Sequence, residues 1–328
     1  MAAKAWCLFI TESSFITPAS PNSASNLDTA YCVLDLPDDD AVSIQRKPNV
    51  EQLTTAKSRG APDRVVGDSY GISGGAKGIL YPTQAPLIAG WGLQLVDQTA
   101  TPDEPWTTDE PDGDLASATF ALAYEDWDFN VTKHRYRGCK AQTFSIESAR
   151  GTRGGVVQWM ADVVGSDQAS MSDSEPALAD YPSDSLAPYH HSDSTLTINN
   201  TAISNYESIS LRATHALEVA FDEWTTAAVI RRQSSTVNMT VVGALKGTPD
   251  WEALFTGQTL MASTKWVLTH PGNNHRITMD LQGVARVPNW TRNIRLQNNR
   301  PNQTIEIVAQ FDRSAGEAFS IAFDDPTP

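Results

Sequence analysis

The amino-acid sequence predicts a mainly β protein with short flanking helices and long loops. Three observations carry this prediction. Apolar and polar residues alternate with a period of two in many short segments, which is typical of strands that bury one face. Segments with the 3.6-residue period of a helix are few and short. The chain has 328 residues, of which 40% are hydrophobic and 19% charged, so it is long enough to bury a sizeable core.

Strands are expected wherever this alternation is clear. In the segment 156–164, Val157, Trp159, Ala161 and Val163 fall on one face of an extended chain. The same criterion predicts a mainly antiparallel arrangement of further strands at 31–36, 118–128, 140–148, 195–199, 206–211, 237–242, 277–281, 305–311 and 319–323.

Two helices are expected between the strands. The clearer one has Thr248 as its N-cap, Pro249 at the first helical position and Gly257 as its stop. A second helix is predicted over 86–96, where apolar residues have helical spacing although two internal glycines oppose it.

Acidic residues are unevenly distributed along the chain. Residues 1–190 contain 13 basic and 26 acidic residues, whereas 191–328 contain 11 and 13. The total net charge of -15 speaks against a general affinity for DNA or anionic membranes. Residues 101–114 are rich in Asp, Glu, Pro and Thr, and residues 166–185 are rich in Ser, Asp and Pro, which predicts long acidic loops at both places.

The first 60 residues have the weakest strand pattern, and we expect 1–60 to be an N-terminal arm or extended segment. Its apolar run 5–10 is too short for a signal peptide or a membrane span, so a cytosolic origin is expected. Cys7, Cys32 and Cys139 are odd in number and widely spaced, which predicts free thiols.

The glycine-rich segment 71–78 contains two partial catalytic motifs. Residues 71–75 match the G-x-S-x-G pattern of serine hydrolases, but no helix can follow at once, so we interpret them as a turn between strands. The same segment fails as a phosphate-binding loop because Ala76 and Gly78 stand where Gly and Ser or Thr are required.

Other chemically suggestive residues lack the required spacing. His190, His191 and Asp193 do not match a metal-ligand set, nor do His134 and Cys139, so solvated histidines in a linker are expected. Carboxylates at 125, 126 and 128 would point to alternate faces of one strand. The sequence therefore predicts no catalytic, cofactor or metal site.

Four segments in a fixed order carry a family resemblance. They are the glycine-rich segment Gly71–Pro82 with the helix after it, then 136–151 with its following strand, then 196–211, and then 237–243 with its short helix. In this order, over about residues 60–315, the chain resembles the tail tube proteins, or major tail proteins, of long-tailed bacteriophages. The resemblance implies a tail-tube-type β-sandwich or barrel with a flanking helix.

An internal duplication of this domain is also indicated. Residues 138–147 and 200–211 resemble each other, and each leads to a strand that ends in Val-Val-Gly. We expect an arm at 1–60, a first tube-like β region with acidic loops at 61–190 and a second at 191–328. In the family six domains close a ring, so two domains per chain imply three chains per ring and one domain implies six.

The resemblance further implies a structural virion protein without enzymatic activity or cofactor. Such a protein is assembled in the host cytoplasm and self-assembles into stacked rings, the conduit for genome delivery. Its partners would be itself, the tape measure protein, the tail-end proteins and phage DNA in transit, without sequence-specific binding and without a membrane. Because DNA must slide, an acidic or neutral bore is expected, and Asp109, Glu110, Asp112 and Asp114 are candidate lumen or ring-contact residues.

Two other functions remain open on the sequence alone. The chain could be another virion structural protein, such as a capsid or decoration protein, although a capsid protein would favour a long spine helix. It could also be a carbohydrate-binding β-sandwich module, because acidic residues and exposed Trp can bind sugars.

Overall fold

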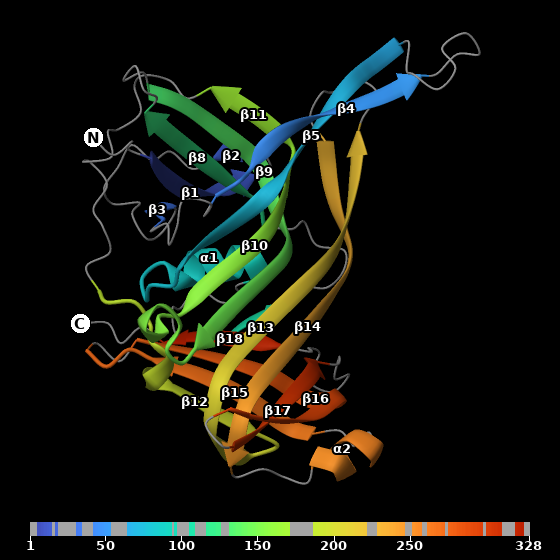
Figure 1. The fold of residues 1–328 in the computed structure, drawn as a ribbon. Coiled ribbons are helices and arrows are strands. Elements are labelled where there is room, and N and C mark those ends of the chain that lie inside the picture. The colour runs from blue at the N-terminus through green and yellow to red at the C-terminus, as the bar shows by residue number, and fades with distance from the viewer. Residues whose placement is uncertain are drawn as a thin grey trace.

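The fold is mainly β, which confirms the predicted class (Figure 1). Every strand pair within the described residues is antiparallel. The structure, a computed structural model, describes residues 5–14, 17–18, 31–34, 42–53, 64–93, 95–96, 105–108, 116–125, 131–170, 186–221, 228–246, 251–257, 261–272, 275–297, 300–309 and 319–324.

The first half of the described chain contains eleven strands and one α-helix. Its elements are β1 (Ala5–Ser14), β2 (Thr17–Pro18), β3 (Tyr31–Val33), β4 (Gln45–Leu53), β5 (Arg64–Ile79), α1 (Ala85–Leu93), β6 (Leu95–Val96), β7 (Pro105–Thr108), β8 (Ala118–Glu125), β9 (Val131–Ala149), β10 (Gln158–Gly165) and β11 (Asp167–Ser170).

The second half of the described chain contains seven strands and one α-helix. Its elements are β12 (Ser194–Ile198), β13 (Thr201–Phe221), β14 (Ala228–Lys246), α2 (Trp251–Gly257), β15 (Met261–Thr269), β16 (Arg276–Gln297), β17 (Arg300–Ala309) and β18 (Ser320–Asp324). Both helices lie where the sequence predicts them, although the proposed cap at 248 and 249 falls outside the described residues.

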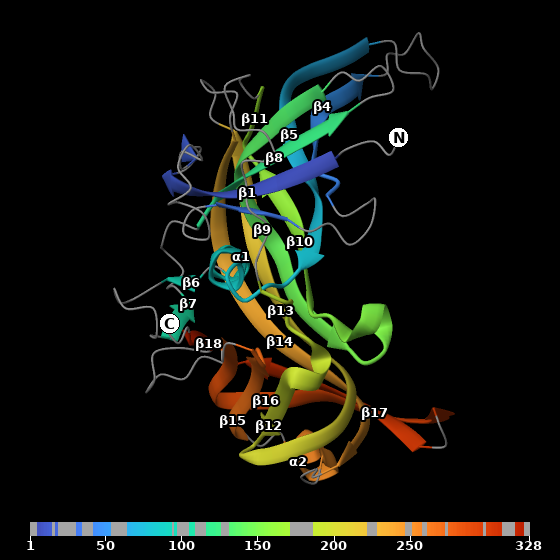
Figure 2. The same ribbon diagram turned by 90° about the vertical axis from the view of Figure 1, so that its left-hand side faces the viewer.

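One sheet organises the whole molecule, and we call it the long sheet. Its strands pair in the order β4, β5, β10, β9, β13, β14, β17 and the C-terminal half of β16. Figure 1 shows β5, β10, β9, β13 and β14 running side by side along the molecule, and Figure 2 shows their curvature from the side.

A second layer covers one face of the long sheet. The N-terminal half of β9 pairs with β8 and β11, and β8 pairs with β1. Likewise the N-terminal half of β16 pairs with β15 and β18. Helix α1 packs between the layers, where Trp91 contacts Phe9, Phe120 and Phe144 edge to face at centroid distances of 5.4, 5.4 and 6.4 Å. The result is a sandwich with a continuous apolar core.

The order and pairing of these elements repeat within the chain. In each half a hairpin of long-sheet strands is followed by a helix, an outer strand, a strand shared by both layers, another long-sheet strand and an outer strand. In chain order, β4, β5, α1, β8, β9, β10 and β11 correspond to β13, β14, α2, β15, β16, β17 and β18.

This repeat differs from the one expected from residues 138–147 and 200–211. Those residues lie in β9 and β13, which hold different positions in the two repeats. Their registers differ too, because Ile146 lies opposite Trp159, whereas Ile209 lies opposite Val241 of the Val-Val-Gly sequence. The repeat is therefore one of topology and pairing, and the local sequence similarity is misleading.

The glycine-rich segment is a strand and not the predicted turn. Gly74, Gly75 and Gly78 lie within β5, which pairs with both β4 and β10. A Cβ at Gly74 would lie 2.4 Å from the carbonyl oxygen of Ser43, so glycine is needed where β4 begins beside β5.

Two further expectations need correction for the described residues. Residues 5–14, expected in an arm, form β1, which pairs with β8 and buries residues 7–10 completely. The predicted acidic loops also contain the short strands β7 and β11, which pair with β18 and β9. Long-range pairing, which local composition does not reveal, accounts for these differences.

Candidate functional site

The long sheet has one apolar face in the core and one polar face exposed to solvent. Along β10, Trp159, Ala161 and Val163 are buried, whereas Met160 and Asp162 between them are exposed. An antiparallel sheet can face water in this way only if its outward side chains tolerate solvent. We call this exposed surface the polar face.

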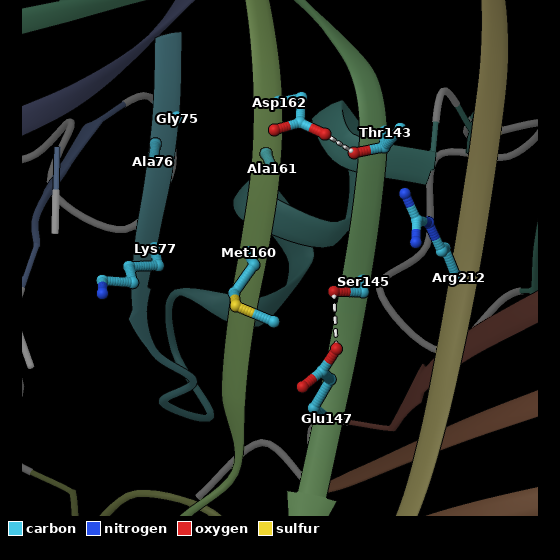
Figure 3. A pocket seen from close by; sticks show the side chains of 10 residues that line it. All are labelled: Gly75, Ala76, Lys77, Thr143, Ser145, Glu147, Met160, Ala161, Asp162 and Arg212. Atoms are coloured by element: carbon cyan, nitrogen blue, oxygen red, sulfur yellow. Dashed lines mark hydrogen bonds between the residues drawn. The ribbon is translucent and has the colours of Figure 1, made fainter. Parts of the chain in front are cut away.

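Its centre is a row of directly opposite residues on four strands. Lys77 lies opposite Met160, Met160 opposite Ser145, and Ser145 opposite Arg212. Together with neighbouring residues they line an open depression of about 280 Å³ (Figure 3). Figure 3 shows that the side chains of the row come from β5, β10, β9 and β13.

Hydrogen bonds across the polar face join neighbouring residues. Thr143 Oγ1 donates to Asp162 Oδ2 at 2.6 Å, and Ser145 Oγ donates to Glu147 Oε1 at 3.2 Å (Figure 3). In the second repeat, Asn289 Nδ2 donates to Glu306 Oε2 at 2.6 Å.

Charged side chains on the central polar face are few. Among described residues of its strands from β5 to β17, over 71–79, 143–149, 158–164, 208–216, 234–242 and 302–308, the outward charges are Lys77 and Arg212 against Glu147, Asp162 and Glu306. Most other outward side chains there are Ser, Thr, Asn or Gln. This surface offers water many hydrogen bonds but offers an anion little net attraction.

The four acidic candidates predicted from sequence, Asp109, Glu110, Asp112 and Asp114, lie outside the described residues. The strand before them, β7, pairs with β18 and β6 of the second layer. The polar face was missed by sequence reasoning, although the alternation at 158–164 contains its signal.

Contrary to expectation, His191 is not a solvated linker residue, and the partly exposed His190 has defined hydrogen-bond partners. His191 is buried, and its Nδ1 shares a hydrogen bond with Ser148 Oγ at 2.7 Å while its Nε2 lies 3.4 Å from the carbonyl oxygen of Tyr206. His190 Nε2 bonds to the carbonyl oxygen of Gly154. Burial lowers the pKa of His191, which favours the neutral ring. These contacts tie the short turn at 191–193 to the ends of β9 and β13.

Within the described part of the chain, no group of three or more His, Cys, Asp or Glu side chains could hold a metal ion. His134 bonds to Gln168 at 3.2 Å and does not form a ligand pair with Cys139, which is buried. The three cysteines are free and buried, as the sequence predicts, and burial raises the pKa of the Cys7 and Cys139 thiols. None of the described helices is both long and apolar enough to cross a membrane.

The fold is a mainly β sandwich whose long sheet has one polar face exposed to solvent. The family model of the phage tail tube proteins matches residues 7–312, and the chain therefore belongs to the phage tail tube protein family. No curated protein matches the chain. Membership makes it a structural protein of the virion tail, and the family as a whole implies self-assembly into a tube and association with other tail components.

Proposed function

We propose that copies of this chain close into rings, that the rings stack into the tail tube, and that the polar face lines the bore through which the genome passes. One observation carries the proposal. The long sheet ends in β4 and in residues 289–297 of β16, and among the described strands each of these edges has a partner on one side only. Unpaired edges are templates for another chain, and closure into a barrel removes them.

The internal repeat supports rings of three chains. Each chain contributes four long-sheet strands from each repeat, and the two sets already join within the chain where β9 pairs with β13. Three chains therefore supply six equivalent sets, as a ring of the family requires. At about 4.8 Å between strands, and with a strand tilt of about 35°, 24 strands form a barrel roughly 45 Å across between backbones. Six chains would supply 12 sets and a barrel about twice as wide, which is more than the six sets of a ring.

The chemistry of the polar face suits a conduit for DNA. Each Lys or Arg that contacts a phosphate adds affinity, and therefore resistance to sliding. The central polar face presents two basic and three acidic side chains among many neutral ones, so it neither holds nor strongly repels a duplex. We propose a passive surface without catalytic role, assembled in the host cytoplasm with tape measure and tail-end proteins as partners.

The proposed domain division follows the repeat. We propose two tube domains that meet near residue 190, with the first including β1 and β4 of the segment 1–60. Asp109, Glu110, Asp112 and Asp114 remain proposed lumen or ring-contact residues.

Electron microscopy of the purified protein tests this function. We expect stacked rings with sixfold outline, each with the mass of three chains, and with β4 and β16 at contacts between chains. Shells, or a monomer that stays dispersed at high concentration with tail initiation proteins present, would refute the proposal. Rings of six chains would agree with a tail tube but would contradict the proposed three chains per ring.

A further inference from the structure

We infer that residues 289–293 of β16 pair with residues 43–47 of β4 from a second copy of this chain, in an antiparallel register that places Thr291 opposite Gln45. This inference rests on the proposed ring and adds the specific surface and register by which two copies join. The evidence is the junction that the chain makes within itself between β9 and β13.

The two repeats can be aligned residue by residue at a shared irregularity. In β9 the register with β10 shifts directly before Thr143, which pairs with Asp162. In β16 the register with β17 shifts directly beside the pair Asn289 and Glu306. Each pair is also joined by a side-chain hydrogen bond of 2.6 Å. Each repeat therefore has a bulge next to a residue pair that is joined by a side-chain hydrogen bond. This shared feature makes Thr143 equivalent to Asn289, and hence Ser145 equivalent to Thr291.

A second, independent marker gives the same alignment. Asp162 lies opposite Gly75 of β5, and its equivalent Glu306 lies opposite Thr240 of β14, so Gly75 is equivalent to Thr240. Counting three residues further along both strands makes Gly78 equivalent to Gly243. Both are glycines at which an added Cβ would collide, with Trp159 Nε1 at 2.7 Å in the first case and with the Asn205 carbonyl oxygen at 2.6 Å in the second. The alignment also maps residues 64–79 of β5 onto β14, whose bounds are 228 and 246.

The same alignment extends to the edge strands. Gln45 lies opposite Ser73, and Arg212 lies opposite Asn238, which is the equivalent of Ser73. Gln45 is therefore equivalent to Arg212. Since Ser145 lies opposite Arg212 within the chain, its equivalent Thr291 should lie opposite Gln45 of the next copy.

Burial of Ile44, Gln45, Trp290 and Thr291 agrees with this register, whereas Arg46, the equivalent of the buried Ala213, is exposed in the single chain. Ile44 is buried, like its equivalent Leu211 beside the internal junction. Thr291 and Gln45 are both exposed and would share the polar face. Trp290 is half-buried, like an inward side chain, and corresponds to the buried Phe144. A shift by one residue between the two copies would place outward side chains of one edge opposite inward side chains of the other, and directly opposite residues of a sheet share one face.

Closure geometry provides a further check. Directly opposite residues lead from Lys77 through Met160, Ser145 and Arg212 to Asn238, whose equivalent, Ser73, lies four residues back along β5. Four strands thus advance the register by about four residues, which at about 3.3 Å per residue and 4.8 Å per strand tilts the strands by about 35°. This tilt falls in the range of roughly 35–45° that closed barrels have.

Thiol cross-linking in assembled tubes tests the register. The variant Thr291→Cys mixed with Gln45→Cys should give dimers of chains with a short bifunctional thiol reagent, in tubes but not in free subunits. The native cysteines are buried and should not react. As a matched control, Thr143→Cys with Thr214→Cys in one chain, a directly opposite pair of the internal junction in which neither residue is buried, should cross-link internally in both states, detected by peptide mapping.

The outcomes separate this inference from the proposed function. If tubes form but Thr291→Cys links to Ile44→Cys or to Lys47→Cys in preference to Gln45→Cys, the register is wrong while the tube remains. If the wild-type chain makes no ring or tube, both the function and the inference fail. If the cysteine variants do not assemble, a near-atomic structure of wild-type tubes shows directly which residue lies opposite Thr291. A residue other than Gln45 there would contradict the proposed register.

Discussion

Trp159 lies directly opposite Gly78, and its indole fills the space that a side chain at residue 78 would need. A Cβ at that position would lie 2.7 Å from Trp159 Nε1, closer than packed atoms approach. Trp159 is completely buried, so it has little freedom to move aside. The glycine in β5 and the tryptophan in β10 are therefore one packing unit.

The variant Gly78→Ala should lose stability because the new methyl group overpacks the core. We expect a cost of about 1–3 kcal/mol, measured by thermal or denaturant unfolding of the subunit. Gly71→Ala is the matched control in the same strand, because nothing lies within 4 Å of the point that its new Cβ would occupy. Its effect should stay within about 0.5 kcal/mol, and equal losses in both variants would contradict this explanation.

Helix α1 is attached to the long sheet by the Trp91 indole, whose Nε1 donates to the carbonyl oxygen of Cys139 at 2.8 Å. Trp91→Phe removes this bond and should cost about 1 kcal/mol more than the loss of ring area alone. Trp159→Phe is the control, because its Nε1 has no partner among the described residues. Unfolding free energies that fall equally for both variants would show that the hydrogen bond is not important.

The buried His191 should make stability depend on pH. Burial lowers its pKa in the folded chain below the ordinary value, so the unfolded chain takes up the proton first as pH falls. The stabilisation is complete above the unfolded pKa of about 6.5 and is lost as pH falls through the lower, folded pKa. His191→Asn should flatten this dependence in melting curves recorded between neutral and mildly acidic pH. An unchanged slope would refute it.

Charge reversal on the polar face should slow the passage of DNA. Replacing Glu147 and Asp162 by Lys places four additional positive units per chain on the proposed bore, which attracts phosphates. Phage carrying these changes should eject DNA more slowly, and the difference should grow at low salt because screening weakens. The neutral variants Glu147→Gln and Asp162→Asn serve as controls. Normal ejection by the lysine variant at every salt concentration would place this face away from the bore.

The acidic segment is tested by a separate change. Replacing Asp109, Glu110, Asp112 and Asp114 together by Lys alters each chain by eight charge units. If the segment lines the bore, tubes should form and ejection should slow at low salt. Normal ejection would indicate the outer surface, and failure to form tubes would indicate a contact between rings. Tube length and ejection rate together identify the placement.

Much of the fold could be predicted from local patterns. The alternation at 156–164 predicts β10 with the correct buried face, and the spacing of apolar residues predicts both helices. The strand β5 was missed because glycines interrupt the alternation there, although pairing on both sides keeps residues 71–75 extended. Local composition also suggested an arm at residues 5–14, which a partner more than 100 residues away, β8, holds in the core.

The sequence by itself determined the fold class, the free thiols, the lack of a catalytic motif and the family resemblance, because these depend on residue type and short-range spacing. Only the tertiary structure decided which strands repeat. Equivalent positions such as Lys77 and Val242 share a place in the pairing pattern but not a residue type. The polar face, and the two edges that have no second partner among the described strands, also appear only when strands far apart in the chain are paired, since exposure of an edge is a property of the whole sheet.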